Sequence, residues 1–429
     1  MTPLAAIARR LVLKVCGILA LAAFSANATN AQTRQFALHD GDTVVFYGDS
    51  ITAQRLYTRF VEEFALTRYP ALHFRFVNAG VPGDTAYGGY AGAVPQRVER
   101  DVAQFHPAMI TVMLGMNDGG YVPESEKIDA VFQKGYRDLL DALHKAAPNA
   151  ALTLITPTPY DEITHGTEFP GYSGTITKNA EDVLQIGAQL QSSGDKTLLI
   201  ADFHRPLTEA LTRAKADFPQ LAPLMIPDRI HPADAGHWSM AAALMSVWHV
   251  DPIVSSVTLN AAAVKITHTE RTTITKLEKS AHGLTWTQLD EALPLPLDLN
   301  SAMTPVLLTV SNIADFDSEI LRIESLEPGQ YRLLIDAKPI AVFSREDLER
   351  GVNLALYKTP MLGQARGIDW EEERRAALDE ARFILSAEVK QTATSPAAEE
   401  RLAQAQDELA ATIRTSATPK PHNFELRRQ

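Results

Sequence analysis

Four short polar stretches carry the residue types that acyl transfer requires: a hydroxyl nucleophile, a base and donors for an anion. In chain order they are Gly-Asp-Ser at 48–50, Gly-Asp-Thr at 83–85, Gly-Met-Asn-Asp at 115–118 and Asp-Arg-Ile-His-Pro at 228–232. Each stretch alone is ordinary, because turns and helix caps use the same residues. Their joint occurrence in this order indicates one catalytic site rather than four unrelated turns.

Ser50 is the candidate nucleophile, because it directly follows an apolar run that ends in Gly-Asp. A serine hydroxyl attacks an ester only when a base removes its proton, and His231 is the best candidate for that base. Asp228 lies three residues before His231, close enough to hold the other imidazole nitrogen. The resulting order Ser, Asp, His is one of several in which the same triad is built.

The negative charge that develops on the ester oxygen needs hydrogen-bond donors. The backbone N–H groups of Ser50 and Gly83 and the side-chain amide of Asn117 could supply them. A glycine lets its backbone approach a substrate closely, and an amide donates without adding a competing charge. Gly80 is a second candidate for the glycine.

Together, these four stretches resemble the four conserved blocks of the SGNH (GDSL-type) hydrolases. The resemblance covers roughly residues 40–250. It implies that Ser50 is the nucleophile, with His231 as its base and Asp228 orienting that base. It also implies a flavodoxin-like three-layer α/β/α sandwich, and no Gly-x-Ser-x-Gly elbow surrounds the serine here.

The same resemblance assigns the oxyanion hole to the Ser50 N–H, Gly83 and Asn117. It favours Gly83 over Gly80 because the glycine of this family usually precedes Asp or Arg and then Thr or Ser. Asp49 and Asp118 are expected to fix the strand ends by hydrogen bonds rather than to act as acids or bases.

These residues must be positioned by an α/β sheet, because apolar strand-like runs alternate with amphipathic stretches from residue 43 to residue 248. Such alternation predicts a parallel sheet covered on both faces, with ligands at the carboxyl ends of its strands. The strand candidates are residues 43–47, 72–78, 109–114, 151–155 and 197–202. The helix candidates are residues 55–69, 94–104, 124–147, 176–191, 205–216 and 235–248, the last capped by Asp234.

After residue 251 the sequence changes in character and leaves the common family pattern. Short β-like runs are expected within residues 254–275 and at 306–310, and residues 331–335 and 340–343 are expected to form a hairpin. Helices are expected at 370–385 and after Ser395-Pro396, where a cap precedes a proline. Residues 415–429 are expected to be a loose tail.

This organisation predicts four segments. They are a signal peptide at 1–31, an SGNH hydrolase domain at 32–252, a β-rich module at 253–345 and a helical extension with its tail at 346–429. The last two resemble the C-terminal extension of exported bacterial members of the family.

The first 31 residues predict a cleaved export signal, and so a periplasmic or extracellular protein. Arg9, Arg10 and Lys14 precede a short apolar stretch, and a small-x-small cleavage pattern ends at Ala28, with Ala31 as a second choice. The alternative is an uncleaved N-terminal anchor. After cleavage of the signal, the mature form is expected to have no stable membrane span.

The net charge and the cysteine content limit the classes of partner and the covalent cross-links that this chain can have. The net charge of −12 becomes −15 when the three basic residues of the export signal are removed. Such an acidic chain argues against nucleic acid and anionic membrane surfaces as partners. The only cysteine, Cys16, lies in the signal, so the mature chain would have no disulfide. No cofactor or metal is expected, because the remaining histidines show no paired ligand spacing.

The expected activity is that of an exported serine esterase that removes short acyl groups, acetyl above all, from carbohydrate. The expected partner is therefore a small-molecule or polysaccharide ester. The alternatives are a lipid or lysophospholipid esterase, a sugar O-acetyltransferase and a non-catalytic carbohydrate-binding protein. In the loop 158–174, Tyr160, Phe169 and Tyr172 could stack on a sugar ring or simply pack together. His237 and Trp238 are expected to pack the start of the last helix.

Overall fold

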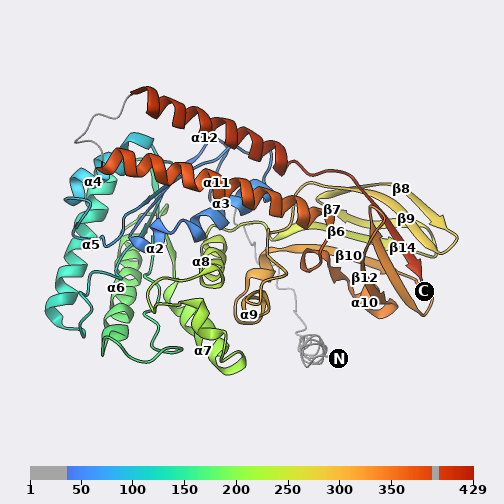
Figure 1. The fold of residues 1–429 in the computed structure, drawn as a ribbon, viewed down its shortest axis with the longest axis horizontal. Coiled ribbons are helices and arrows are strands. Elements are labelled where there is room, and N and C mark those ends of the chain that lie inside the picture. The colour runs from blue at the N-terminus through green and yellow to red at the C-terminus, as the bar shows by residue number, and fades with distance from the viewer. Residues whose placement is uncertain (1–35, 389–395) are drawn as a thin grey trace. The chain divides into compact units, whose positions relative to one another are not determined.

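The computed structural model describes residues 36–388 and 396–429, so the expected export signal and Ser395 lie outside the described residues (Figure 1). Within those two ranges, no helix is long and apolar enough to cross a membrane. The first part of the chain, residues 36–252, is an α/β fold. The second part, residues 253–429, combines β sheets with two long helices.

A five-stranded parallel sheet forms the centre of the first part, as the alternating pattern predicts. Its strand order is β2-β1-β3-β4-β5, and β1 pairs in parallel with β2 and with β3. This is the flavodoxin-like order. The strands are β1 (Thr43–Gly48), β2 (Arg75–Gly80), β3 (Met109–Met113), β4 (Ala151–Ile155) and β5 (Leu199–Ala201).

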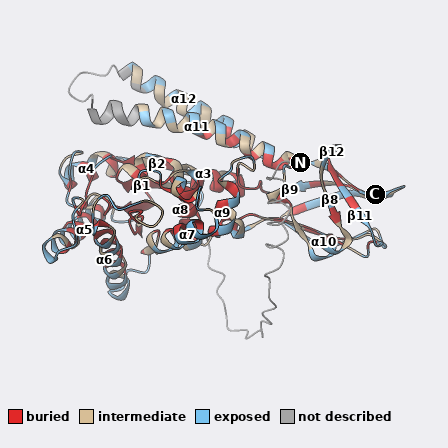
Figure 2. Ribbon diagram, turned by 60° about the horizontal axis from the view of Figure 1, so that its bottom comes forward, coloured by how far each residue is buried: buried red, intermediate tan, exposed pale blue. Residues whose placement is uncertain are grey.

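Helices cover both faces of this sheet because its strands are apolar on both sides. On β1, Val44 and Phe46 join the core with α3, α7 and α8, whereas Val45 and Tyr47 join the core with α4 and α5. Figure 2 shows the buried layers on the two sides. The helices are α2 (Ser50–Ala53), α3 (Leu56–Arg68), α4 (Val94–Asp101), α5 (Glu126–Ala146), α6 (Tyr172–Ser192), α7 (His204–Asp217) and α8 (Asp234–Val247).

The start of α8 differs from the prediction. Asp234 was expected to cap this helix, but it is the first helical residue, and Ala233 occupies the cap position without a side-chain bond. A carboxylate in the first turn still interacts favourably with the positive end of the helix dipole. His237 and Trp238 are buried in this helix, as expected.

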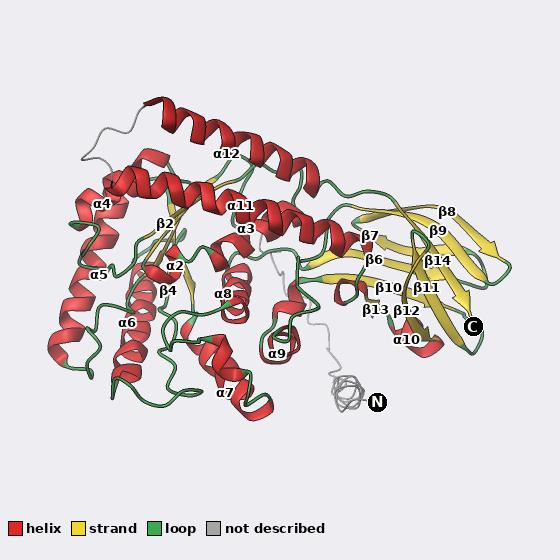
Figure 3. Ribbon diagram, in the orientation of Figure 1, coloured by secondary structure: helices red, strands yellow, loops and turns green. Residues whose placement is uncertain are grey.

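Two further sheets form most of the second part (Figure 3). One has the strand order β13-β10-β6-β7 and the other β12-β11-β14-β9-β8. Their strands are β6 (Ile253–Asn260), β7 (Lys265–Glu270), β8 (Thr272–Ser280), β9 (Gly283–Asp290), β10 (Ser318–Glu324), β11 (Gln330–Ile335), β12 (Lys338–Ser344), β13 (Val352–Asn353) and β14 (His422–Arg428). The expected hairpin is confirmed as the antiparallel pair β11–β12.

Residues 306–310 were expected to be β-like, and that prediction is wrong. They belong to the helix α9 (Thr304–Val310), which has a proline in its first turn. Val306, Leu307 and Val310 are buried in the core of the first part. Their spacing places them on one helical face, and packing there overrides the β preference of valine.

The prediction of a loose tail at 415–429 is also wrong for most of its length, and residues 415–417 are the end of a helix. Residues 422–428 form β14, which pairs with β11 on one side and β9 on the other. Phe424 and Leu426 are buried while Glu425 and Arg427 are not, the alternation of a half-buried strand. The C-terminus therefore completes the second sheet from its middle.

Two long helices lie between β13 and β14 in the sequence: α11 (Pro360–Glu388) and α12 (Pro396–Ala417). The helix α11 begins ten residues before the predicted residue 370, because the Thr359 hydroxyl accepts the Leu362 N–H and Pro360 opens the helix. Between β13 and these helices lies a short 3-10 helix, and α10 (Arg345–Arg350) follows β12.

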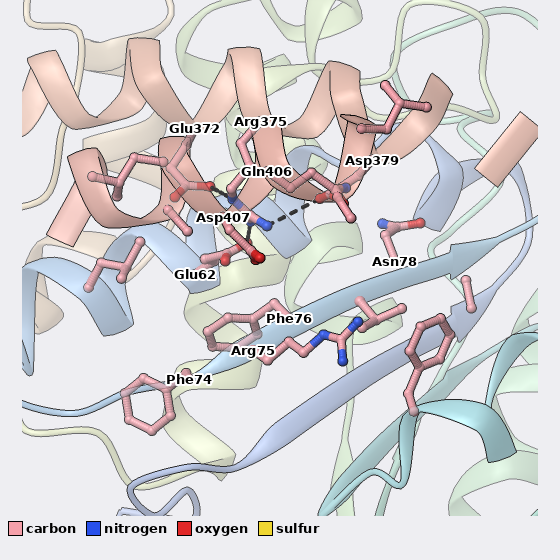
Figure 4. Close-up of a pocket in the computed structure, with 18 of the residues that line it drawn as sticks. Glu62, Phe74, Arg75, Phe76, Asn78, Glu372, Arg375, Asp379, Gln406 and Asp407 are labelled. Carbon is pink, nitrogen blue, oxygen red and sulfur yellow. Dashed lines mark hydrogen bonds and ion pairs between the residues drawn. The ribbon is translucent and has the colours of Figure 1, made fainter. Parts of the chain in front are cut away.

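A cavity of about 700 Å³ lies between these two helices and the edge strand β2 (Figure 4). Phe74 and Phe105 line one side, and Leu402 and Ile413 of α12 line the other. Arg375 of α11 forms ion pairs with Glu62, Glu372 and Asp379 along its roof. This ionic cluster ties α11 to α3, the helix that follows α2.

Candidate active site

The end of β1 places Ser50 at the carboxyl edge of the sheet. The strand ends at Gly48, and the Asp49 carboxylate caps α2 by accepting the Ile51 N–H at 2.9 Å. Ser50 is the first residue of that short helix. The turn that follows the strand thus fixes the serine where ligands bind in open α/β sheets.

His231 connects Ser50 to Asp228. The His231 Nε2 lies 2.8 Å from the Ser50 Oγ, and its Nδ1 lies 2.7 Å from the Asp228 Oδ2. The structure therefore brings the three predicted residues into one hydrogen-bonded chain. A proton can pass from the serine hydroxyl to the imidazole while the carboxylate holds the ring.

The Asp228 carboxylate is held by its own loop. Its Oδ1 accepts the backbone N–H groups of Ile230 and His231 at 3.0 and 2.7 Å. Partial burial alone would raise the pKa of Asp228, but the hydrogen bonds from His231 and Ile230 outweigh it and lower the pKa. The carboxylate therefore stays ionised, as the orienting group of the imidazole must.

Two of the expected oxyanion donors are free. In the described chain, the backbone N–H groups of Ser50 and Gly83 donate no hydrogen bond. Gly83 has a φ of +75°, and a Cβ built on it would meet nothing within 4 Å. Its backbone therefore faces open space, as an anion donor requires.

The Asn117 amide lies against the loop that carries Gly83. Its Nδ2 donates to the Asp84 carbonyl oxygen at 3.0 Å, and its Oδ1 accepts the Tyr121 hydroxyl at 3.2 Å. An amide nitrogen carries two hydrogens. The second one is available to a substrate oxygen.

Gly80 has a different role. A Cβ built on Gly80 would lie 2.3 Å from the Ala53 backbone nitrogen, so only glycine allows α2 to pack against β2. The Gly80 N–H already donates to the Asn78 Oδ1. These contacts favour Gly83 as the glycine of the oxyanion hole.

Arg97 supports the strand ends and was missed by the sequence analysis. Its guanidinium donates to the carbonyl oxygens of Gly48 and Ala79, at 2.7 and 2.5 Å, and forms an ion pair with Asp84. It also lies 3.8 Å from the centre of the Tyr47 ring. The signal was available, because Arg97 occupies the apolar face of α4 between Val94 and Val98.

Asp49 and Asp118 behave as expected, as buried groups that accept backbone hydrogen bonds. Asp118 accepts the Ala86 N–H at 2.8 Å. Burial raises the pKa of Asp118 to about 7, and the nearby charge of Asp49 adds to that rise. Burial likewise raises the pKa of Asp49 to about 6, against the opposing effects of the Ile51 N–H and His231.

A second network joins the helix of the nucleophile to the loop of the base. Burial lowers the pKa of His237 to about 3, so this imidazole is neutral. Its Nδ1 accepts the Tyr57 N–H at 3.2 Å, which leaves its Nε2 to donate to the Gln54 Oε1 at 3.1 Å. Gln54 in turn donates to the Pro232 carbonyl oxygen at 3.3 Å.

The loop 158–174 packs onto itself. Tyr160 and Tyr172 are 3% and 0% exposed, with their ring centres 5.3 Å apart, so of the two alternatives for these rings the structure shows packing. Phe169 packs against Tyr160 and Tyr121. The loop instead holds the base in place, because Arg229 forms hydrogen bonds to Gly166 and an ion pair with Glu168.

The site as a whole is open. The side chains of His231 and Asp228 are 32% and 56% exposed. In the part of the chain that the structure describes, no group of three or more His, Cys, Asp or Glu side chains is arranged to hold a metal ion. The chemistry described above uses only protein groups.

This fold and this triad define a serine hydrolase with an open active site. Residues 46–238 match the GDSL-like lipase/acylhydrolase family. Within this segment the chain is an SGNH/GDSL-type acylhydrolase, which is a carboxylic ester hydrolase.

Two relatives extend the comparison. An acetylxylan esterase from Geobacillus stearothermophilus is 26% identical over 222 residues, which cover 48% of this chain and 93% of that protein. The solved structure of a gut microbial diltiazem-metabolizing enzyme is 24% identical and matches with a TM-score of 0.77, over 91% of this chain and 98% of that one. The second likeness shows that the fold of both parts is shared.

Proposed function

We propose that this protein is an exported esterase that removes acetyl groups from carbohydrate. The observation that carries the proposal is the continuous contact from Ser50 through His231 to Asp228, next to free oxyanion donors. The relative that matches over 93% of its own length is an acetylxylan esterase, which supports acetyl groups on a sugar as the substrate.

The geometry suits a two-step reaction. The Ser50 Oγ attacks the acetyl carbonyl carbon while the His231 Nε2 takes the hydroxyl proton. The carbonyl oxygen becomes an anion that accepts hydrogen bonds from the Ser50 and Gly83 N–H groups and from Asn117. The protonated imidazole then gives its proton to the departing sugar oxygen, which leaves an acetyl group on Ser50.

The second step regenerates the enzyme. His231 takes a proton from water, and the resulting hydroxide attacks the acetyl carbon of the acyl-enzyme. The same donors hold the second oxyanion, and the Ser50 oxygen leaves with the proton from the imidazole. If a sugar hydroxyl replaced this water, the same residues would transfer the acetyl group to it, which is the acyltransferase alternative.

The exposure of the base supports a substrate that extends beyond the acetyl group. With a third of the His231 side chain exposed, the leaving sugar can remain joined to an oligosaccharide outside the site. The export proposal rests on the basic and apolar pattern of the first 31 residues. N-terminal sequencing of the protein from its native cell tests it, with a start at residue 29 or 32 expected.

The proposed function is tested by measuring the free acid that the enzyme releases from a panel of substrates, which is acetate from the acetyl esters and a fatty acid from the lysophospholipid. The panel contains acetylated xylo-oligosaccharides, an acetylated polysaccharide, a lysophospholipid and p-nitrophenyl acetate, each with and without an acceptor sugar. Mass spectrometry is expected to find free acetate from the carbohydrates at the highest kcat/KM. A preference for the lysophospholipid, or acetyl transfer to the acceptor sugar in place of free acetate, would contradict the proposal.

A further inference from the structure

The loop between β2 and α4, which contains Gly83, carries two exposed aromatic side chains. Tyr90 is 83% exposed and Tyr87 is 49% exposed, whereas the site tyrosines Tyr160 and Tyr172 are buried. In the described residues neither Tyr87 nor Tyr90 packs against another ring. A tyrosine ring that is exposed and packs on no other ring can meet a ligand with its apolar face and its hydroxyl.

The base of this loop is part of the oxyanion region. It begins at Gly83, and the Asp84 carbonyl oxygen accepts the Asn117 amide at 3.0 Å. The Ala86 N–H donates to Asp118, and Asp84 pairs with the buried Arg97. The loop is therefore fixed to the same groups that are expected to hold the substrate oxygen.

The tip of the loop is a closed turn. The N–H groups of Gly89 and Gly92 donate to each other's carbonyl oxygens at 3.3 and 3.0 Å, with Tyr90 and Ala91 between them. The Ala91 carbonyl oxygen accepts Arg100 at 3.2 Å. These bonds fix the backbone of Tyr90, so the backbone loses little further conformational entropy when the ring binds a ligand.

The turn folds back onto Gly83. A Cβ built on Gly89 would lie 3.6 Å from the Gly83 carbonyl oxygen and 3.1 Å from the Asp84 Oδ1. Tyr90 is the next residue after Gly89. Its side chain is 83% exposed, so it extends into solvent from a turn whose backbone lies close to Gly83.

We infer that Tyr90 is a stacking platform for a sugar ring of the substrate, at the side of the site formed by the loop 83–93. A tyrosine ring offers an apolar face to the C–H groups of a pyranose and a hydroxyl to its oxygens. The ring would hold the sugar that carries the acetyl group or its neighbour while the ester lies against Ser50. This inference rests on the proposed function, because it needs a carbohydrate ester as substrate.

The test compares two substrates across three variants. Tyr90→Ala removes the ring, Tyr90→Phe keeps its face, and Trp370→Ala removes a 68% exposed ring of α11 as the matched control. For each variant, kcat/KM is measured on acetylated xylo-oligosaccharides and on p-nitrophenyl acetate, which has no sugar. Thermal unfolding confirms that each variant is folded.

Tyr90→Ala is expected to lower the ratio of the two kcat/KM values, oligosaccharide over p-nitrophenyl acetate, by about tenfold, mainly through KM. Tyr90→Phe and Trp370→Ala should keep the wild-type ratio. An unchanged ratio in Tyr90→Ala, with acetate still released by the wild-type enzyme, refutes the platform and leaves the proposed function intact. No acetate release from the oligosaccharides by the wild-type enzyme refutes both.

Discussion

Ser50, His231 and Asp228 are joined by two hydrogen bonds, and the groups that would meet the substrate oxygen lie on three different loops. Asn117 is the only one of these donors that belongs to a side chain, so it can be removed without changing the backbone. The backbone at Gly83 faces open space, whereas the backbone at Gly80 is tightly packed. Predictions at the scale of single residues follow from these contacts.

Asn117→Ala is expected to lower kcat by about a hundred- to a thousandfold, or about 3–4 kcal/mol, because an oxyanion donor is lost in the transition state. KM should change little, since the ground-state carbonyl needs that donor less. Steady-state kinetics on p-nitrophenyl acetate measure both. Tyr121→Phe is the control, since it removes only the hydroxyl that Asn117 accepts. A loss of less than tenfold in Asn117→Ala would exclude this residue from the oxyanion hole.

Gly80→Ala and Gly83→Ala are expected to fail in different ways. The new methyl at 80 would collide with the Ala53 backbone, so the free energy of unfolding should fall by about 3 kcal/mol, the upper end of the usual cost of overpacking. The methyl at 83 meets no atom, but the φ of +75° strains an alanine there by about 1–2 kcal/mol. Because the methyl also occupies the space of the substrate oxygen, kcat/KM should fall in Gly83→Ala at temperatures where the variant is still folded. Urea unfolding and kinetics on both variants decide this, and the opposite pattern would make Gly80 the oxyanion glycine.

The triad was predictable from sequence because its signals are local. Asp228 and His231 lie three residues apart, and Ser50 directly follows a strand. Arg97 and the Gln54–His237 bond were not predicted, because their partners are brought together only by the fold. Gln54 and His237 are 183 positions apart in the chain.

Among the structural elements, the turns after β1 and β3 hold the buried carboxyl groups of Asp49 and Asp118. Both accept backbone N–H groups, from Ile51 and Ala86. Burial disfavours their charged forms, so these turns hold protons that an unfolded chain would release. The stability of the first part should depend on pH for that reason.

Asp118→Asn is expected to flatten this pH dependence. The folded pKa of Asp118 is about 7, above the value of 3.8 for a free side chain. Its contribution to stability is therefore full below about pH 4 and is lost as the pH rises through about 7. The asparagine imitates the protonated acid and still accepts the Ala86 N–H.

Melting temperatures measured between about pH 4.5 and about pH 8.5 test this prediction. Relative to the wild type, Asp118→Asn should melt higher at the alkaline end than at the acidic end. Asp138→Asn, at a carboxylate 58% exposed on α5, is the matched control and should shift the curve by a constant. A pH-independent difference for Asp118→Asn would contradict a raised pKa.

Helices and strands could be predicted where apolar residues recur with a regular spacing over a long segment. The predictions failed where a segment is buried by contacts with distant parts of the chain. The five parallel strands were found because each is a run of apolar residues between turn residues. Residues 306–310 were mistaken for a strand because valine and threonine favour strands, although their buried positions follow a helical spacing. The start of α8 was predicted one residue too late, at 235 with Asp234 as the cap, whereas the helix begins at Asp234. Helix ends are where assignments commonly differ by a residue.

At the scale of the whole molecule, the C-terminal residues return to both parts of the fold. The helix α11 contacts α3 through the ion pairs of Arg375 with Glu62 and of Arg59 with Asp369. The strand β14 then closes the second sheet, where Phe424 stacks on Trp286 with ring centres 5.1 Å apart. The C-terminal residues therefore stabilise both parts of the fold, although the last residues of a chain are usually poorly ordered.

Leu426→Ala is expected to destabilise the second part by about 2–5 kcal/mol, because it empties a fully buried site in the middle of the sheet. Arg427→Ala, on the exposed face of the same strand, should change stability by less than about 0.5 kcal/mol. Urea unfolding followed by tryptophan fluorescence measures both. Equal midpoints for the two variants would mean that residues 422–428 are loose, as the composition of the tail first suggested.

The tail was missed although its pattern alternates in two-residue steps, because termini are usually poorly ordered and the segment is short. Which strand it pairs with could not be read from sequence at all. β14 pairs with β9 more than 130 residues earlier, and only the completed sheet decides that partner.

The central claim is that Ser50 attacks the ester. Its most direct test is the rate of p-nitrophenyl acetate hydrolysis by Ser50→Ala, compared with the wild type at equal concentration and with matched melting temperatures. Ser50→Ala is expected to lose at least about a thousandfold in kcat, because the Ser50 Oγ is the hydroxyl in contact with the His231 Nε2. An unchanged rate would contradict it.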